Sequence, residues 1–449
     1  MIKFLSTDRL IRSMTNDFEK QFYEIGAATL SITPEAGVSL YSLDGIVRTS
    51  SKIHSGLNVS AITIGCSKDL LIIVSLDLIW VDKIFTEKVK KWLKQYIEDY
   101  DYRAHLVLAA THSHSTPQIS KKICNSTKPD EHYLFFLYSQ VCQVIKNALS
   151  NKEKCYAELS VTNPKLTVNR RKKILSLDML KRGIFKFIIA NRPNYKSKID
   201  DKLYTIWFYD LKSKEKAVLL NYACHPTLFR KNAVSADFPG AVSRNIKHQI
   251  SEDVVVCFLQ GFAGNVKADL TKYSCFHYSG FLPYIYSCLF DRLQFNKRIS
   301  TKKLEDFSVN LAKSAMLRCE SKKIYPKLLF YSKSIKLPLQ GDISTKSENI
   351  DIFYISIANE LKMVALGGEI FSEYSLWLRS FLMRYKVYSL TVGYCNSMVG
   401  YIPTHKAMLE GGYEVERTFE EFSHSSPFSD RIEGFIKHEI KKLIKMDLG

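Results

Sequence analysis

The sequence predicts a layered α/β domain with a mixed, mostly parallel central sheet flanked by helices. Short apolar runs typical of buried strands alternate with segments whose apolar residues recur at helical spacing. The chain has 449 residues, of which 46% are hydrophobic, and this is enough to bury a large core. A disordered chain is therefore excluded. No stretch of about 18 uncharged apolar residues occurs, so no transmembrane helix is expected.

The predicted elements follow one another as strand and helix. Strands are expected where β-branched and leucine-rich runs occur, at 70–76, 105–110, 217–220, 254–258, 363–366 and 387–392. Helices are expected at the amphipathic segments 84–97, 132–149 and 372–383. This alternation favours parallel strand pairs, because a helix between two strands returns the chain to the same end of the sheet.

We expect a single domain over residues 1–449, because composition hardly changes along the chain and no repeat interrupts it. Residues 172–202 are basic and broken by Pro193, so we expect an insertion or a mobile flap there. Residues 431–446 predict a lysine-rich amphipathic helix. We expect this helix to dock on the core, with an anionic membrane surface as the alternative.

The net charge of +19 permits anionic partners. The lysines are scattered, however, and no nucleic-acid or phosphate-binding motif accompanies them, so we expect a solvated basic surface and no nucleic-acid partner. The ten cysteines form no CxxC pair and are expected to be mostly buried. Charged residues interrupt residues 1–20 before an apolar run can form, which does not resemble a signal peptide. We therefore expect a cytoplasmic protein.

Two histidines follow the strand expected at 105–110, in the segment Thr111-His112-Ser113-His114-Ser115. In an extended chain, residues two apart point the same way, so His112 and His114 can share one space. Imidazole is a common zinc ligand, and sites form at strand ends in open α/β sheets. The motif predicts one or two metal ligands, with two hydrogen-bonded loop histidines as the alternative.

Two further candidates are weak alone. His225 follows the strand expected at 217–220, and the next residue is a proline that disfavours helix at this point. Glu369 follows Gly367-Gly368, whose glycines let the backbone turn closely around a centre. A carboxylate facing the dipole of a following helix is the alternative for Glu369. Only together do His112, His225 and Glu369 indicate a metal site.

Short segments spaced along residues 26–416 occur in the order found in one known family. They are Gly26-Ala27-Ala28, Ile32-Thr33-Pro34, Ser75-Leu76-Asp77-Leu78, Ala110-Thr111-His112-Ser113-His114-Ser115-Thr116-Pro117, Asn169-Arg170, Asn221-Tyr222-Ala223-Cys224-His225-Pro226-Thr227, Ser235-Ala236-Asp237-Phe238-Pro239-Gly240, Gln260-Gly261-Phe262-Ala263-Gly264, Gly400-Tyr401-Ile402-Pro403-Thr404 and Gly412-Tyr413-Glu414. Together they resemble the N-terminal catalytic domain of the neutral/alkaline, non-lysosomal ceramidases and their bacterial relatives.

The resemblance implies a catalytic core over residues 26–416. Members of the family mostly carry an additional C-terminal β-sandwich domain, which we do not expect here. The resemblance implies one catalytic Zn²⁺, and the implied ligands are His112, His225, Glu369 and Tyr401. It further implies catalytic roles for His114 and Tyr413, and substrate contacts for Arg170 and Tyr413.

Two segments depart from the family pattern. Gly264-Asn265-Val266-Lys267-Ala268 stands where the family often has Gly-Asp-x-x-Pro, so a carboxylate and a proline are lost. We therefore expect that a second ion or a loop contact is missing at this segment. Gly367-Gly368 stands where Pro-Gly is common, and this change keeps the tight turn.

The resemblance implies zinc-dependent hydrolysis of an N-acyl amide bond, in a ceramide-like lipid or another N-acylated small molecule. Zinc would activate a bound water molecule by lowering the pKa of that water to about 7. Arg170 would hold a polar or anionic part of the substrate. Asp77 and Asp237 follow strand-like runs and are candidates to orient a ligand histidine through its second nitrogen, with structural capping as the alternative.

Two other functions stay open at this point. An ester or lactone hydrolase, or a biosynthetic tailoring enzyme, would use the same metal site. A catalytically silent basic protein would instead bind an anionic membrane or nucleic acid. For the enzyme we expect at most peripheral contact with an anionic membrane.

Overall fold

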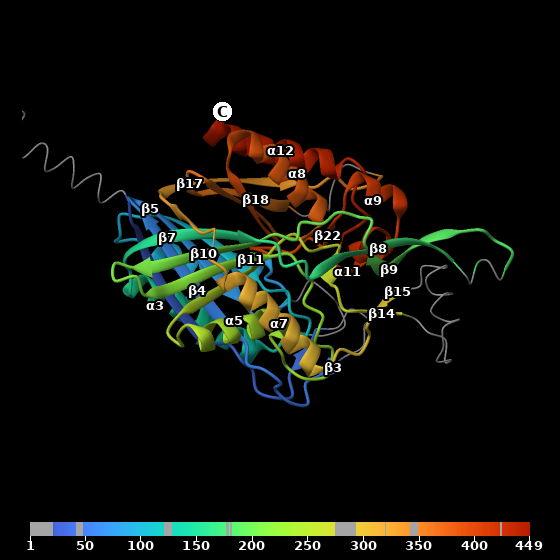
Figure 1. The fold of residues 1–449 in the computed structure, drawn as a ribbon, viewed down its shortest axis with the longest axis horizontal. Coiled ribbons are helices and arrows are strands. Elements are labelled where there is room, and N and C mark those ends of the chain that lie inside the picture. Colours follow the sequence, from blue (N-terminus) through green and yellow to red (C-terminus); the bar gives the residue numbers. More distant parts are fainter. Residues whose placement is uncertain are drawn as a thin grey trace, which may run out of the picture.

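The computed structural model describes residues 21–41, 48–120, 128–176, 179, 182–273, 293–318, 320–341, 349–422 and 424–449. The expectation that residues 1–20 hold no signal peptide lies outside the described residues. The elements form four layers: helices, a large sheet, a small sheet and further helices (Figure 1).

The large sheet contains most of the strands from the first two thirds of the chain. In spatial order they are β12 (Val255–Gln260), β11 (Glu215–Tyr222), β10 (Leu203–Asp210), β7 (Glu153–Thr162), β1 (Tyr23–Ser31), β4 (Asn58–Cys66), β5 (Asp69–Leu76) and β6 (Arg103–Ala110), with β16 (Lys322–Ile324) also paired to β7. In the described part of this sheet, β11–β12 and β5–β6 are parallel and the other pairs are antiparallel.

The predicted mixed sheet is confirmed, but the predicted excess of parallel pairs is wrong. Hairpins account for the difference. Between β4 and β5 only Ser67 and Lys68 turn the chain, with Ser67 at φ 56°, so the strand before residue 70 returns antiparallel without a helix.

The small sheet packs face to face with the large one. Its strands, in spatial order, are β17 (Pro326–Lys336), β18 (Asn349–Ala358), β19 (Leu361–Leu366) and β21 (Tyr388–Val392). Buried side chains from both sheets form one cluster, in which Ile62 and Ile73 of the large sheet join Ile355 and Met363 of the small one. Burial of each such side chain contributes about 1.5–3 kcal/mol.

Helices cover the two outer faces. The large sheet is covered by α2 (Lys83–Tyr96), α3 (Glu131–Ser150), α5 (Asp237–Gln249) and α7 (Thr301–Met316), and the small sheet by α8 (Ser372–Leu382) and α12 (Ile432–Leu448). The predicted helices near 84–97, 132–149 and 372–383 are confirmed. So is the docking of the C-terminal helix, because α12 buries Ile436, Ile440 and Leu443 in the core. No helix in the described ranges has both the length and the apolar character needed to cross a membrane.

Short elements connect these layers. They are β2 (Ser39–Leu40), β3 (Arg48–Thr49), β8 (Thr167–Leu175), β9 (Phe187–Asn194), β13 (Val266–Ala268), β14 (Thr271–Tyr273), β15 (Leu293–Phe295), β20 (Glu369–Ile370), β22 (Tyr401–Ile402), α9 (His405–Glu410), α10 (Tyr413–Glu416), α11 (Thr418–Glu421) and the 3-10 turn Met383–Tyr385. Strands β8 and β9 form a hairpin with β13 beside it, so part of the insertion predicted at 172–202 has regular structure.

Candidate metal centre and active site

His112 and His114 lie in the turn that leaves β6. The backbone of His112 is left-handed, with φ 68°, a conformation that non-glycine residues seldom adopt. The N–H of His112 donates to the Leu78 carbonyl at 2.9 Å, which holds the turn. The two Nε2 atoms lie 3.3 Å apart. The predicted shared space is therefore confirmed, but a left-handed turn creates it and the predicted extended backbone is wrong.

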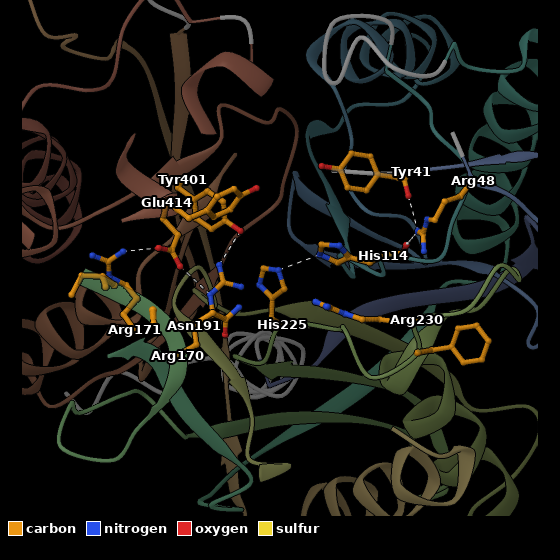
Figure 2. A pocket seen from close by; sticks show the side chains of 14 residues that line it. Tyr41, Arg48, His114, Arg170, Arg171, Asn191, His225, Arg230, Tyr401 and Glu414 are labelled. Carbon is orange, nitrogen blue, oxygen red and sulfur yellow. Dashed lines mark hydrogen bonds and ion pairs between the residues drawn. The ribbon is translucent and has the colours of Figure 1, made fainter. Parts of the chain in front are cut away.

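His225 completes a cluster of three imidazoles. It follows β11, and its N–H donates to the Val266 carbonyl at 3.2 Å. Its Nε2 lies 3.3 Å from that of His112 and 3.1 Å from that of His114. Side chains separated by more than 110 positions in the sequence thus meet at one point (Figure 2).

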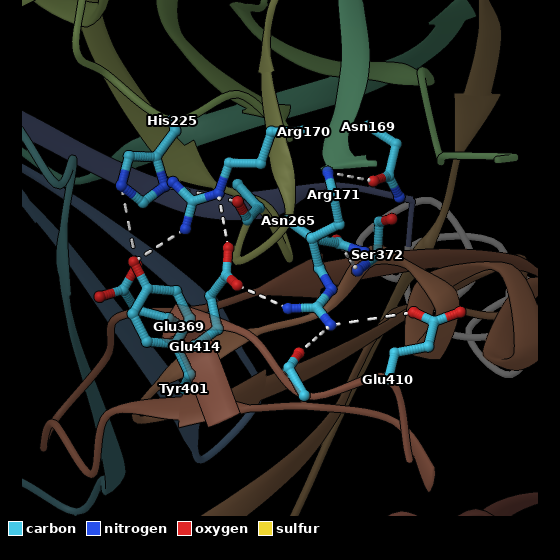
Figure 3. Close-up of polar contacts among 12 residues, drawn as sticks. Asn169, Arg170, Arg171, His225, Asn265, Glu369, Ser372, Tyr401, Glu410 and Glu414 are labelled. Carbon is cyan, nitrogen blue, oxygen red and sulfur yellow. Dashed lines mark hydrogen bonds and ion pairs between the residues drawn. The ribbon is translucent and has the colours of Figure 1, made fainter. Parts of the chain in front are cut away.

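Glu369 and Tyr401 reach the same centre from β20 and β22. These two strands pair in parallel, with Glu369 opposite Tyr401. Glu369 Oε2 lies 3.3 Å from His112 Nε2 and 3.8 Å from His225 Nε2. The side chains of Glu369 and Tyr401 are buried, as are those of His112 and His225. The structure therefore brings together the residues that the sequence proposed as metal ligands. Figure 3 shows three of them, His225, Glu369 and Tyr401.

The atoms at the centre are lone-pair donors that face one another. His112 Nδ1 donates to the Ile79 carbonyl at 2.7 Å and His225 Nδ1 to the Ala263 carbonyl at 3.4 Å, so in a neutral ring each Nε2 carries a lone pair. Burial, followed by the positive charge of Arg170, holds the pKa of His225 well below its usual range. Glu369 Oε2 is buried and accepts no hydrogen bond from any described residue. Two imidazoles and a carboxylate arranged in this way fit a divalent cation, which would give these lone pairs a common partner.

A buried charge network supports Tyr401 from the other side. Arg170 Nη2 donates to Tyr401 Oη at 2.9 Å, and Arg170 Nε lies 3.2 Å from Glu414 Oε1. Arg171 Nη1 donates to Glu414 Oε2 at 2.6 Å. Burial alone lowers the pKa of Arg170, but Tyr401 and Glu414 raise it above its ordinary value, so the guanidinium stays charged.

Both guanidiniums reach Glu414 because β8 is irregular at this point. Adjacent residues of a regular strand point to opposite faces. The pairing of β8 with β9 shifts register between Asn169 and Arg171, and such a bulge redirects a side chain.

A cavity of about 410 Å³ opens onto the centre. Its lining residues are Tyr41, Arg48, His114, Arg170, Arg171, Ile189, Ala190, Asn191, His225, Phe229, Arg230, Tyr401, Tyr413 and Glu414 (Figure 2). Burial, followed by the electrostatic influence of His112 and the positive charges of three arginines, lowers the pKa of His114 well below its usual range. His114 therefore stands neutral at the floor of a basic pocket.

The family model described as "Neutral/alkaline non-lysosomal ceramidase, N-terminal" matches residues 23–281, which is more than half of the chain. The chain belongs to this family. Two solved structures have the same fold: the neutral ceramidase from Pseudomonas aeruginosa and a ceramidase complexed with C2. They are 15% and 14% identical to this chain, each with a TM-score of 0.71, and the matches cover 93% of this chain and 73% and 74% of theirs. No curated protein matches the chain.

The resemblance seen in the sequence is thus confirmed, and membership places the chain among the amide-bond hydrolases. The roles proposed for Asp77 and Asp237 in this ceramidase-type site are wrong. Main-chain carbonyls, not these carboxylates, accept from Nδ1 of the two histidines. Asp77 instead accepts from the Asn58 N–H at 3.0 Å, and Asp237 from the Phe229 N–H at 2.8 Å. Each carboxylate fixes a loop, the structural role that the sequence left open.

Tyr413 lies at the mouth of the ceramidase-type pocket. It is 39% exposed, and its hydroxyl donates to Glu421 Oε1 at 3.2 Å. Its ring centroid is 6.2 Å from that of Tyr401. Contact with a substrate at this position suits the pocket, and the catalytic role of Tyr413 stays a prediction.

Asn265, the departure from the ceramidase pattern, is fully used in packing. Its Nδ2 donates to Glu373 Oε2 at 2.7 Å, and its Oδ1 accepts from the Ser372 N–H at 2.9 Å. An aspartate could not donate to Glu373 and would bring two carboxylates together. The asparagine is therefore matched to Glu373 on α8, because its amide group links the loop at residue 265 to the start of this helix.

Two further residues of the site were not predicted from the sequence. Tyr394 stacks on the His112 ring with centroids 4.0 Å apart, and its buried hydroxyl has no hydrogen-bond partner among the described residues. Tyr394 follows the short strand β21, and no sequence motif distinguishes it from other tyrosines. Arg171 is the second of these residues. It was not predicted because the family segment, Asn169-Arg170, ends at its neighbour.

Proposed function

We propose that this chain is a zinc-dependent amidohydrolase that cleaves the N-acyl amide bond of a ceramide-like lipid or another N-acylated small molecule. The convergence of two imidazole nitrogens and the orphaned carboxylate of Glu369 at the floor of a pocket supports this most strongly. Histidine and carboxylate donors suit zinc, with Tyr401 as the fourth proposed ligand. When bound, zinc would polarise the amide carbonyl and make water nucleophilic near pH 7.

The residues of the chain would position the substrate and move the protons. His114 is held neutral beside the centre, so its Nε2 can take a proton from the attacking water and pass it to the leaving amine. Arg170 orients Tyr401 through its Nη2 and keeps a positive charge where an oxyanion develops. Tyr413, at the mouth, would contact the part of the substrate beyond the scissile bond.

The test measures hydrolysis and metal content together. Purified protein would be assayed with an N-acyl sphingoid base, a simple N-acyl amine and an acyl ester that share one acyl chain, before and after chelation. We expect amide cleavage that is lost with the metal and restored by Zn²⁺, and loss of both metal and activity in His225→Ala. Full amide cleavage without metal would refute the proposal. Cleavage of the ester alone would favour the ester hydrolase instead.

A further inference from the structure

The hairpin of β8 and β9 extends outward from the layered body of the molecule (Figure 1). Its outer part carries large apolar side chains that water surrounds. The exposed fractions are 49% for Ile184, 79% for Phe185, 58% for Phe187 and 39% for Ile188. Four such residues in a run of five are unusual at a surface, since scattered single apolar residues are normal but a contiguous patch marks a binding surface.

Basic residues accompany this apolar patch. Over residues 172–188 the sequence has five cations and the single acid Asp178, and the cations are Lys172, Lys173, Lys181, Arg182 and Lys186. Arg182 and Lys186 flank Ile184 and Phe185 and are themselves exposed. Lys173 Nζ lies 5.3 Å from the centre of the Phe187 ring across the hairpin. The outer hairpin thus combines aromatic and aliphatic side chains with a local excess of positive charge.

The same hairpin forms a wall of the pocket. Ile189, Ala190 and Asn191 of β9 line the cavity, and Arg170 and Arg171 of β8 lie at its floor and side. Asn191 lies four residues after Phe187 in this strand, which is about 13 Å of extended chain. A surface that held Phe185 and Phe187 would therefore lie close to the pocket mouth.

We propose that the outer β8–β9 hairpin, residues 182–188 with Lys173, is a docking surface for an anionic lipid membrane. Aromatic and aliphatic side chains insert at the boundary between headgroups and acyl chains, while lysine and arginine bind the anionic headgroups. Single-stranded nucleic acid is a poorer match, because base stacking requires aromatic rings and makes no use of Ile184 and Ile188. A second copy of the chain would place like charges against each other. The proposal stands on the hairpin and does not depend on the reaction catalysed.

Vesicle sedimentation with the full chain tests the surface. We expect the protein to pellet with phosphatidylcholine vesicles that contain phosphatidylserine, to pellet weakly with phosphatidylcholine alone, and to be released by salt. Phe185→Ser with Phe187→Ser should weaken binding by about tenfold or more, because two exposed rings no longer enter the bilayer. Arg182→Gln with Lys186→Gln should weaken it by about 25-fold, at about fivefold for each cation.

Matched control variants separate this surface from general basicity. Phe135 on α3 is 71% exposed, so Phe135→Ser removes an equally accessible ring elsewhere. Lys91→Gln with Lys94→Gln removes two exposed cations from α2. Both controls should bind vesicles as the unchanged protein does. Equal weakening by control and hairpin variants would overturn the proposal, as would binding of single-stranded DNA through the hairpin without any binding to vesicles.

Tryptophan fluorescence tests the proposal even if the serine variants do not fold. Phe185→Trp keeps an apolar ring at the tip, and its emission should shift to the blue and be quenched by brominated acyl chains in anionic vesicles. Phe135→Trp should show neither effect. Identical behaviour of the two tryptophans would contradict insertion of the hairpin.

Discussion

The Nε2 atoms of His112, His114 and His225 lie 3.1–3.3 Å from one another. In neutral rings those of His112 and His225 both carry a lone pair, so no hydrogen bond joins these two. The three histidines differ in what holds their second nitrogen. Nδ1 of His112 and of His225 donates to a main-chain carbonyl, and no such bond fixes His114 among the described contacts. Ligands of a metal are usually oriented by such bonds. This difference supports His112 and His225 as ligands and His114 as the residue that moves the proton.

His114→Ala tests that division of roles. We expect the variant to retain one metal ion per chain but to lose about 100-fold or more in kcat, because general acid–base catalysis contributes on this scale. His112→Ala and His225→Ala should instead lose the metal. Metal analysis of each purified variant, followed by amide hydrolysis, distinguishes the cases. Loss of the metal from His114→Ala would make His114 a ligand.

Glu414 is the one carboxylate that contacts both Arg170 and Arg171 in the described network. Glu414→Gln should lower the free energy of unfolding by about 3 kcal/mol, because it leaves buried guanidiniums without their compensating charge. Glu410 also pairs with Arg171, at 3.8 Å, but its side chain is 32% exposed. Glu410→Gln should therefore cost less than about 1 kcal/mol. Urea unfolding of both variants measures the difference, and equal costs would contradict the network.

The part of the site that lies in short sequence motifs could be predicted from the sequence. His112, His225 and Glu369 each follow an apolar strand, and the family resemblance added Tyr401 and Arg170. The structure brings all of them to one centre. The partners of the ligand histidines could not be predicted, because main-chain carbonyls such as that of Ile79 leave no mark in a sequence.

At the scale of elements, the three predicted helices and several strands were found, but the inner strands β1 and β4 were not predicted. The apolar spacing of 84–97 and 132–149 marks helices directly. Strands β1 and β4 lie inside the sheet, yet they carry small and polar residues in place of an apolar run. Thr29 Oγ1 and Ser60 Oγ satisfy each other at 2.9 Å across these strands. Polar pairs of this kind hide a buried strand from an analysis based on hydrophobicity.

Gly26 in β1 allows α3 to approach the sheet closely. A Cβ atom at this position would lie 1.8 Å from the Ala148 carbonyl oxygen at the end of α3. Gly26→Ala should destabilise the fold by about 3 kcal/mol, since backbone has to move. Gly434 in α12 has no neighbour within 4 Å of such an atom, so Gly434→Ala should stabilise the fold by about 0.5–1 kcal/mol through helix propensity. Thermal unfolding should show opposite signs, and equal signs would contradict this packing.

Asp447 ties α12 to the small sheet. It accepts from Lys362 Nζ and Tyr354 Oη at 2.9 Å and from Lys327 Nζ at 3.1 Å. Burial raises the pKa of Asp447, but these bonds outweigh burial and hold the pKa below its ordinary value. The carboxylate therefore stabilises the fold above its unfolded pKa, about 3.9, and this contribution is lost as pH falls through the folded pKa.

Asp447→Asn should cost about 3 kcal/mol at pH 7, because buried Lys362 loses its counter-ion. The difference between the two proteins should shrink as the pH is lowered from 5 toward about 3. Asp101→Asn, at a side chain 83% exposed, is the control and should change stability by less than about 0.5 kcal/mol. Denaturant unfolding across this pH range measures both, and a constant difference would argue against the ion pair.

For the whole molecule, the layered α/β class and the mixed sheet were predicted correctly. The sequence predicted one central sheet flanked by helices, whereas the structure has two sheets packed face to face with helices outside. Strand order depends on hairpins, whose short turns the sequence did not reveal. The net charge of +19 also proved too coarse a description. Most lysines are scattered, but residues 172–202 are basic already in the sequence, and the hairpin places cations of this segment beside exposed aromatic rings. A single domain and a cytoplasmic location stay predictions.

Anomalous diffraction at the zinc absorption edge, from crystals of the purified protein, tests the metal centre most directly. We predict one peak at about 2.0–2.2 Å from His112 Nε2, His225 Nε2 and a carboxylate oxygen of Glu369, with the Tyr401 hydroxyl completing the ligands. A zinc-loaded crystal without a peak between these side chains, or with its peak at another site, would contradict the account.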